Sequence, residues 1–374
     1  MQPRTRRCAA ALLTAVLAFT PAALRAQPPA TRLATLAHGI NFTNWFRFPP
    51  NQTDSHFTGY IDDATLATLH RVGFTFVRLA VQPELMLNGS GRPDSHRLGL
   101  LVAAIARIER QGLGVMVGWH PQTWHLDASP VEQQQLQDLW GALAQRMARL
   151  DPGRTFPEVL NEPVFDKNEA GWEALQEKVL ARIRAVLPQA TVVLTGNNWG
   201  SIDGLVGLHP VADGNVVYSF HSYDPTVLTT LASFEPGLDH MALTHLPFPV
   251  EGDHACDAAE TATTQQRTRD VAAYYCSEHW NDAKVREMID RAADWGRRNH
   301  AAVVAGEFGA SDQLPPPTRL AWIAAMRRAL EADGIGWALW GYDDSMGFDI
   351  HPDRHPRRPL DPALLSALGL AGHA

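Results

Sequence analysis

The chain has 374 residues, of which 45% are hydrophobic and 19% charged, a globular composition that excludes a disordered or fibrous protein. Its formal charge of −8 argues against nucleic acid or an anionic membrane surface as a partner. No apolar run reaches the roughly 20 residues of a membrane span. The length suits two domains or one α/β barrel, since such barrels run to about 250 residues or more.

The first residues have the pattern of a targeting segment. Arg4, Arg6 and Arg7 precede an apolar stretch, 9–23, which suits a signal peptide and is too short for a spanning helix. We therefore expect a signal peptide, 1–26, and export to the periplasm or the extracellular space, with an uncleaved anchor as the alternative. The mature chain, 27–374, would keep 28 basic and 40 acidic residues, a formal charge of −12.

Two cysteines are left in the mature chain, because Cys8 lies within the predicted signal peptide. Cys256 and Cys276 are close in sequence, and in an exported chain this pattern predicts one disulfide that closes a loop. Two free thiols are the alternative. Metal binding is less expected, because the pair has no CxxC spacing and no neighbouring Cys/His cluster.

Short apolar runs alternate with segments of helical periodicity along the rest of the chain. The predicted strands are 38–42, 76–79, 114–120, 156–162, 192–196, 216–223, 302–309 and 335–342. The predicted helices are 98–110, 136–150, 172–186, 285–298 and 320–330. Eight strands that are apolar on both faces predict a (β/α)8 barrel formed by a single domain. A doubly wound sheet is the alternative, disfavoured because no glycine-rich phosphate loop follows the first strand.

One interval in this pattern is abnormally long. The segment 224–280, which follows the sixth predicted strand, holds both remaining cysteines and is rich in proline, histidine and acidic residues. Loops of this length usually shape a functional site or are disordered. We expect this excursion to border the substrate cleft, with a structural flap on the outer wall of the barrel as the alternative.

Polar side chains gather at the carboxyl ends of the predicted strands, where barrels of this type place their chemistry. They are Asn41, Arg78, His120, Asn161, Glu162, His221, Tyr223, Glu307 and Trp340. Glu162 and Glu307 follow the fourth and seventh strands, and two carboxylates across a barrel mouth suit glycoside hydrolysis. One acts as general acid, while the other attacks the anomeric carbon or activates water.

The same strand ends carry motifs that resemble glycoside hydrolase family 5, the cellulase-type members of a retaining clan of (β/α)8 barrels. The motifs are GIN at 39–41, FVR at 76–78, WH at 119–120, EVLNEP at 158–163, HSY at 221–223, GEFG at 306–309 and WALW at 337–340. The resemblance implies that Glu162 is the acid/base, Glu307 the nucleophile, and that no cofactor or metal is needed.

The resemblance also implies roles for the other site residues. Arg78 and Tyr223 would orient Glu307, and His221 would lie near Glu162. The residues expected to contact the substrate are Asn41, Asn161 at the 2-hydroxyl, His120 in the −1 subsite and Trp340 as a platform under that sugar. Further candidate platforms near strand ends are Trp45, Trp119, Trp124 and Trp199. His120 and His125 lack a third ligand of recognisable spacing for zinc.

The sequence thus predicts an exported, monomeric, retaining endo-β-1,4-glucanase that acts on a β-linked polysaccharide or oligosaccharide. A β-mannanase or another β-glucan hydrolase is the alternative within the same class. A metal-dependent barrel hydrolase would need a His-x-His motif near the end of the first strand, where this chain has Asn41 to Asn44 as NFTN. A sugar-binding protein without catalysis is disfavoured by the presence of both Glu162 and Glu307.

Overall fold

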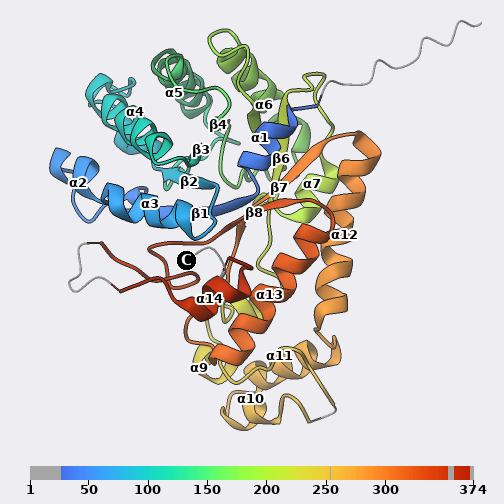
Figure 1. Ribbon diagram of the computed structural model, residues 1–374. Coiled ribbons are helices and arrows are strands. Elements are labelled where there is room, and N and C mark those ends of the chain that lie inside the picture. The colour runs from blue at the N-terminus through green and yellow to red at the C-terminus, as the bar shows by residue number, and fades with distance from the viewer. Residues whose placement is uncertain (1–26, 253, 353–357, 371–374) are drawn as a thin grey trace, which may run out of the picture.

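The computed structural model describes residues 27–252, 254–352 and 358–370 (Figure 1). The predicted signal peptide, 1–26, lies outside these residues and stays a prediction. In the described part of the chain, eight parallel strands pair in sequence order, and β1 pairs with β8 to close a barrel. The strands are β1 His38–Phe46, β2 Phe76–Val81, β3 Gly114–Trp119, β4 Thr155–Glu158, β5 Val192–Thr195, β6 Val216–His221, β7 Ala302–Phe308 and β8 Gly336–Leu339. The predicted (β/α)8 barrel is therefore confirmed.

Helices follow the strands and cover the outside of the barrel (Figure 1). The helices of the β/α units are α3 Asp63–Arg71, α4 Ser95–Arg110, α5 Pro130–Met147, α6 Glu169–Arg184, α7 Ile202–Gly207, α12 Asp282–Asn299 and α13 Pro316–Ala332. The five predicted helices correspond to α4, α5, α6, α12 and α13. The sequence did not reveal α3 and α7, because nine and six residues give too few turns for a clear period.

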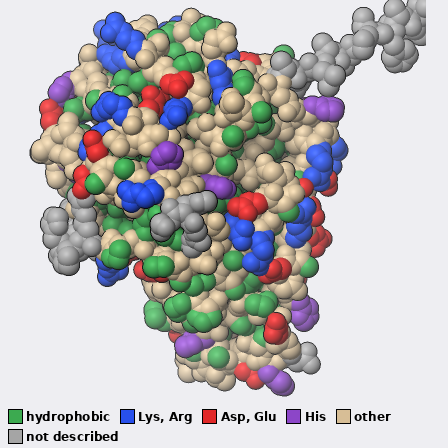
Figure 2. All heavy atoms as spheres, viewed as in Figure 1, with side chains coloured by type: hydrophobic (Ala, Val, Ile, Leu, Met, Phe, Trp, Pro, Cys, Tyr) green, Lys and Arg blue, Asp and Glu red, His purple; other side chains and the backbone are tan. Residues whose placement is uncertain are grey.

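Further helices lie near the ends of the described chain and in the loops. They are α1 Ala30–Thr35, α2 Asp54–Gly59, η1 Pro83–Met86, α8 Thr226–Thr229, α9 His240–Leu243, α10 Asp257–Thr261, α11 Gln266–Ser277 and α14 Pro362–Ala367. Within the described residues, no helix is both long and apolar enough to cross a membrane. Figure 2 shows basic and acidic side chains interspersed over the face of the barrel that is in view.

The barrel interior is apolar at one level and polar at the next. Its apolar cluster consists of Leu36, Phe76, Met116, Phe156, Val193, Val217, Val304 and Ala338. Because alternate residues of a strand point the same way, the residues two positions after Phe76 and Phe156 also point inward. These residues are Arg78 and Glu158, both fully buried. The strand period thus places a charged layer directly above the apolar one.

A glycine on β3 makes room for that charged layer. Gly118 pairs in register with Glu158 of β4, and a Cβ atom at Gly118 would lie 2.3 Å from Oε2 of Glu158. Such a distance is shorter than any van der Waals contact allows. The absence of a side chain at Gly118 therefore lets a carboxylate occupy the centre of the barrel.

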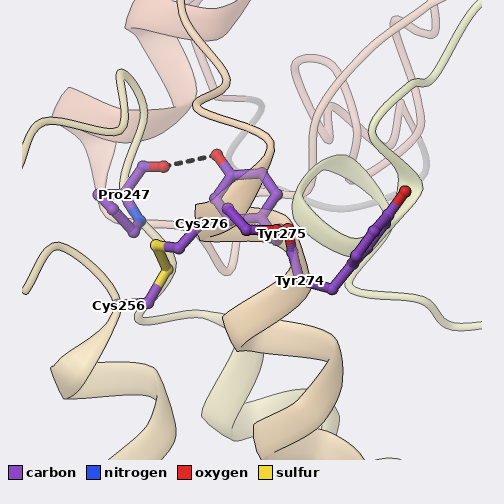
Figure 3. Close-up of a disulfide and its surroundings, with 6 residues drawn as sticks. Pro247, Cys256, Tyr274, Tyr275 and Cys276 are labelled. Carbon is purple, nitrogen blue, oxygen red and sulfur yellow. Dashed lines mark hydrogen bonds between the residues drawn. A yellow bond between two sulfur atoms is a disulfide. The ribbon is translucent and has the colours of Figure 1, made fainter. Parts of the chain in front are cut away.

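The long excursion after β6 folds into the four helices α8 to α11. Figure 1 shows α9, α10 and α11 grouped at one end of the molecule, away from α4, α5 and α6. Cys256 and Cys276 form a disulfide there, as predicted, and join the start of α10 to α11 (Figure 3). Next to it, the Tyr275 hydroxyl donates to the carbonyl of Pro247 at 2.6 Å. The excursion is a helical, cross-linked element.

Candidate active site

Arg78 is the centre of the polar network inside the barrel. Its Nε and Nη2 donate to Oε2 and Oε1 of Glu158 at 2.9 and 3.0 Å. Its Nη1 donates to Oε1 of Glu307 at 2.6 Å and to Oδ1 of Asn41 at 2.9 Å, and Nη2 also donates to Oδ1 of Asn161 at 2.8 Å. Arg78 therefore fixes four side chains from β1, β4, β7 and the segment after β4, and it has no exposed surface of its own.

Glu307 is held as a carboxylate. Besides Arg78, the Tyr223 hydroxyl donates to its Oε2 at 2.8 Å. Burial by itself raises the pKa of Glu307, but the charges of His221, Arg78 and Arg47 and the bond from Tyr223 outweigh burial and hold this pKa below its usual value. In turn, burial and the neighbouring carboxylates raise the pKa of Tyr223, which keeps its hydroxyl protonated and donating. The site thus favours an ionised, oriented Glu307.

Glu162 lies opposite Glu307 in a different environment. Its side chain is 26% exposed, against 4% for Glu307, and Nδ1 of His221 lies 2.9 Å from its Oε1. The same Nδ1 atom lies 3.5 Å from Oε2 of Glu307. Glu162 also has a φ of 45°, the left-handed region that side chains other than glycine seldom adopt. The predicted β4 extends too far, since the strand ends at Glu158 and the chain turns sharply to present Glu162.

The two asparagines expected in the site differ in what they face. Asn41 is fully buried, and its Nδ2 donates to the carbonyls of Gly306 and Leu339, both at 3.1 Å. Asn41 therefore ties β1 to β7 and β8, so the structure favours a supporting role over direct contact with substrate. Asn161 accepts from Arg78 through Oδ1, and in the described residues no acceptor is recorded for its Nδ2. That amide group is available to a sugar hydroxyl.

His120 and Trp340 form a pair beyond the ends of β3 and β8. Their rings are stacked, with centroids 6.2 Å apart and an interplanar angle of 20°. Burial, together with the charges of Arg78 and Arg47, holds the pKa of His120 well below its usual value. Both ring nitrogens of His120 are buried without a hydrogen-bond partner among the described residues. A neutral imidazole with open hydrogen-bonding atoms suits contact with a substrate hydroxyl.

The other tryptophans divide between cleft and core. Trp124 and the exposed Trp199 line a cavity of about 420 Å³ together with Asn161, Glu162 and Arg47. Trp45 is fully buried, and its indole donates to the carbonyl of Phe57 at 2.8 Å, so the prediction of a platform there is wrong. Trp119 is also fully buried and packs edge-on against Trp140, so it is not a platform either.

The residues that line this cavity include none from the excursion. They come from the loops after β1, β3, β4 and β5 (Figure 1). This cavity covers the Glu162 side of the site and includes neither Glu307 nor Tyr223, after which the excursion begins. The expectation that 224–280 borders the cleft and the alternative of a structural flap therefore both stay predictions.

Sequence reasoning missed two charged residues of the site. Glu158 begins the EVLNEP motif, but no role was predicted for it from the sequence. Because it lies two positions after Phe156 on β4, the period of the strand could have placed its side chain inside the barrel. Arg47 directly follows β1, in a connection to α2 without periodicity, and no sequence signal pointed to it. Its guanidinium lies over the ring of Trp340, 5.3 Å from the centroid.

Glu162, His221 and Glu307 offer atoms that lie within 4.8 Å of one another, a spacing that could in principle hold a metal ion. The surrounding charges disfavour it. Arg78 already neutralises Glu307 at 2.6 Å, and Arg47 adds a second positive charge nearby. A divalent cation would be repelled by both guanidinium groups. The arrangement instead suits two carboxylates that act on a substrate between them.

The sequence pattern described as Cellulase (glycosyl hydrolase family 5) matches residues 37–345. The chain belongs to glycosyl hydrolase family 5. The chain is 24% identical to Endoglucanase 3 of Fibrobacter succinogenes over 356 residues, with 87% of this chain and 53% of that protein covered. It is 23% identical to Endoglucanase C of Acetivibrio thermocellus, with 88% and 97% covered. It therefore spans about half of the first relative and nearly all of the second.

Solved structures share the fold of this family 5 member. The crystal structure of endoglucanase Cel5A from the hyperthermophilic Thermotoga maritima superposes with a TM-score of 0.74 at 22% identity, and the match covers 91% of this chain and 99% of that one. At this identity the similarity shows the barrel alone, and the assignment of residues in the site depends on the contacts described above.

Proposed function

We propose that this family 5 chain is a retaining endo-β-1,4-glucanase. The observation that carries the proposal is the pair of carboxylates, with an oxygen of Glu162 within 4.8 Å of an oxygen of Glu307. Retaining glycosidases place their carboxyl groups about 5–5.5 Å apart, whereas inverting enzymes need about 6.5–9.5 Å to admit a water molecule. The names of the relatives support a β-glucan as the substrate.

In the first step, Glu307 attacks the anomeric carbon while Glu162 gives its proton to the departing glycosidic oxygen. The bond between the two sugars breaks, and an ester forms between the sugar and Glu307. Tyr223 and Arg78 hold the two oxygens of Glu307 so that its attacking lone pair faces the substrate. His221 contacts Glu162, which suits a group that changes between acid and base during the cycle.

In the second step, Glu162 takes a proton from water, and the hydroxyl oxygen attacks the anomeric carbon. The ester bond breaks, Glu307 leaves as a carboxylate, and Arg78 again pairs with it. Two inversions give a product with the starting configuration. In both steps Asn161 and His120 offer hydrogen bonds to the sugar, and Trp340 supports its apolar face.

The proposal includes export through the predicted signal peptide, 1–26, and action as a monomer on a β-linked polysaccharide or oligosaccharide. A panel of soluble β-1,4-glucans, mixed-linkage β-glucans and β-mannans, followed by release of reducing ends, tests the substrate. We expect the highest rate on a β-1,4-glucan, with a rapid fall in viscosity for endo action. A higher rate on mannan would overturn the glucanase assignment, and an α-anomer as the first product would overturn retention.

A further inference from the structure

Arg47 is a half-buried cation that has no counterion among the described residues. It follows β1, and its guanidinium lies over two rings, 4.7 Å from the centroid of Phe48 and 5.3 Å from that of Trp340. Its Nε atom is buried and has no hydrogen-bond partner, and no ion pair of its side chain is recorded in the described ranges. Arginine has five N–H donors in a rigid, planar guanidinium group. The two rings support the guanidinium of Arg47, and no hydrogen bond from its side chain to another described residue is recorded.

Arg47 lies in the candidate active site, because it lines the same cavity as Asn161 and Glu162. Its charge acts on both catalytic carboxylates. Burial lowers the pKa of Arg47, and the negative charges of Glu307 and Glu162 oppose this shift. The reciprocal effect on Glu307 favours its ionised form.

Arg47 differs from Arg97, another arginine that lies over an aromatic ring, in having no recorded acceptor for its guanidinium. Arg97 also lies over a ring, 5.1 Å from the centroid of Phe57, but its Nη1 donates to the carbonyl of Gln52 at 2.8 Å. That guanidinium is engaged in the fold and lies outside the cleft. Arg47 has the same support by aromatic rings without such an acceptor. The missing acceptor is therefore expected from a ligand rather than from the protein.

We propose that Arg47 is a further substrate-binding and positioning residue: its free N–H groups donate to hydroxyls of the sugar chain at the Trp340 platform, and its charge stabilises ionised Glu307. The proposal rests on the proposed glucanase function and adds a residue to that site. The donors suit a neutral glycan, because sugar hydroxyls accept hydrogen bonds and the nearby Glu162 and Glu307 disfavour an anionic substituent.

Other charged and titratable groups also act on Glu307, so the contribution of Arg47 is one of several. The groups that face Glu307 from the surrounding elements are Arg78 of β2, Glu162 after β4, His221 of β6, Tyr223 after β6 and Asp344 after β8. Arg78 contacts Glu307 directly and stays in place when Arg47 is changed. Removal of Arg47 is therefore expected to weaken the preference for the ionised form without abolishing it.

Two variants distinguish the contribution of the positive charge of Arg47 from that of its planar set of N–H donors. R47Q removes the charge, while R47K keeps the charge and removes the planar set of donors. We expect R47Q to shift the acid limb of the pH profile of kcat/KM to higher pH, and R47K to leave that limb in place. Both variants should raise KM for a soluble β-1,4-glucan by about tenfold, the loss expected for hydrogen bonds from a charged donor. R97Q and R97K are the matched controls and should behave as the unchanged enzyme.

A binding measurement makes the test independent of turnover. Calorimetric titration of cellotetraose into E307Q and into R47Q/E307Q should show about tenfold weaker binding to the double variant. Thermal unfolding of each variant verifies folding, and a variant that does not fold is replaced by R47M. Equal binding with an unshifted acid limb would overturn the role of Arg47. If the unchanged enzyme released no reducing ends from any glucan, the proposed function would fail instead, whatever the variants showed.

Discussion

Arg78 and Glu158 form a bidentate ion pair inside the barrel, with donor–acceptor distances of 2.9 and 3.0 Å and no exposed side-chain surface on either residue. Glu158 does not reach the cleft, so its effect passes through Arg78 to Glu307 and Asn161. The catalytic carboxylate is thus positioned by a second, hidden carboxylate on a different strand. Gly118 makes this arrangement possible, because any side chain there would collide with Glu158.

E158Q is expected to destabilise the protein strongly. Removal of one partner from a buried ion pair leaves the other charge uncompensated and typically costs about 3–5 kcal/mol. Arg78 keeps its bond to Glu307, so we expect a loss of about 3 kcal/mol in the free energy of unfolding, measured by urea denaturation. E235Q is the matched control, since the Glu235–Arg267 pair is more than half exposed on both sides and should change stability by less than about 1 kcal/mol. Equal losses in the two variants would contradict the structural role of Glu158.

E307Q is expected to remove turnover while the fold persists. Glutamine keeps the shape of the side chain and one oxygen that can accept from Arg78 or from Tyr223, but its amide cannot form the glycosyl ester, so kcat should fall by about 10³-fold or more. Release of reducing ends from a β-1,4-glucan measures the loss, and circular dichroism verifies the fold. A folded E307Q that retains a tenth of the activity would show that Glu307 is not the nucleophile.

E162Q is expected to lose activity in a way that depends on the leaving group. Substrates with activated leaving groups need little help from an acid, so the first step should proceed almost normally on an aryl β-cellobioside. Azide should increase turnover further, because this anion attacks the glycosyl ester without base catalysis. The comparison of dinitrophenyl and natural cellooligosaccharide substrates measures the effect. The same loss on both substrates, without rescue by azide, would refute the acid/base role.

Stability against acid should depend on Glu307. Because its folded-state pKa lies below the unfolded value of about 4.3, its ionisation stabilises the native state above that pH, and this contribution is lost as the pH falls through the folded pKa. The free energy of unfolding of the unchanged protein should therefore fall more steeply below about pH 4.3 than that of E307Q. The two should run parallel from pH 5 to 7. A difference that is independent of pH from 2.5 to 7 would contradict a lowered pKa.

The double variant C256S/C276S tests the role of the excursion. The cross-link closes a loop with a sequence separation of 20, for which chain-entropy models give about 3 kcal/mol of stabilisation. Since the cavity at Glu162 is lined by no residue of 224–280, we expect lower thermal stability and an unchanged set of oligosaccharide products. A changed cleavage position would restore the interpretation of the excursion as a cleft wall. Two free thiols in the unfolded, untreated mature protein would exclude the disulfide itself.

The sequence by itself was sufficient for the barrel and most of the site. Strands that are apolar on both faces, at intervals that fit one crossover helix, predict parallel pairing. In a barrel of parallel strands, the carboxyl ends of all strands lie at the same end of the barrel. Glu162, Glu307, His221 and Tyr223 could therefore be placed together without coordinates. The disulfide between Cys256 and Cys276 was also predicted from the sequence, because the two residues are close in the chain and the protein is expected to be exported.

Only the tertiary structure decided which side chains face the cleft and which support it. Trp45 lies at the end of β1 and Trp199 lies after β5, yet Trp45 packs in the core and Trp199 is 61% exposed, because the packing around each segment sets the direction of its ring. Glu158 and Gly118 became a matched pair through their register, which joins residues 40 positions apart. Arg47 lies in a loop without a periodic pattern, and its contact with Trp340 forms across almost 300 residues of sequence. Such contacts depend on packing between distant segments, and local sequence patterns carry no information about that packing.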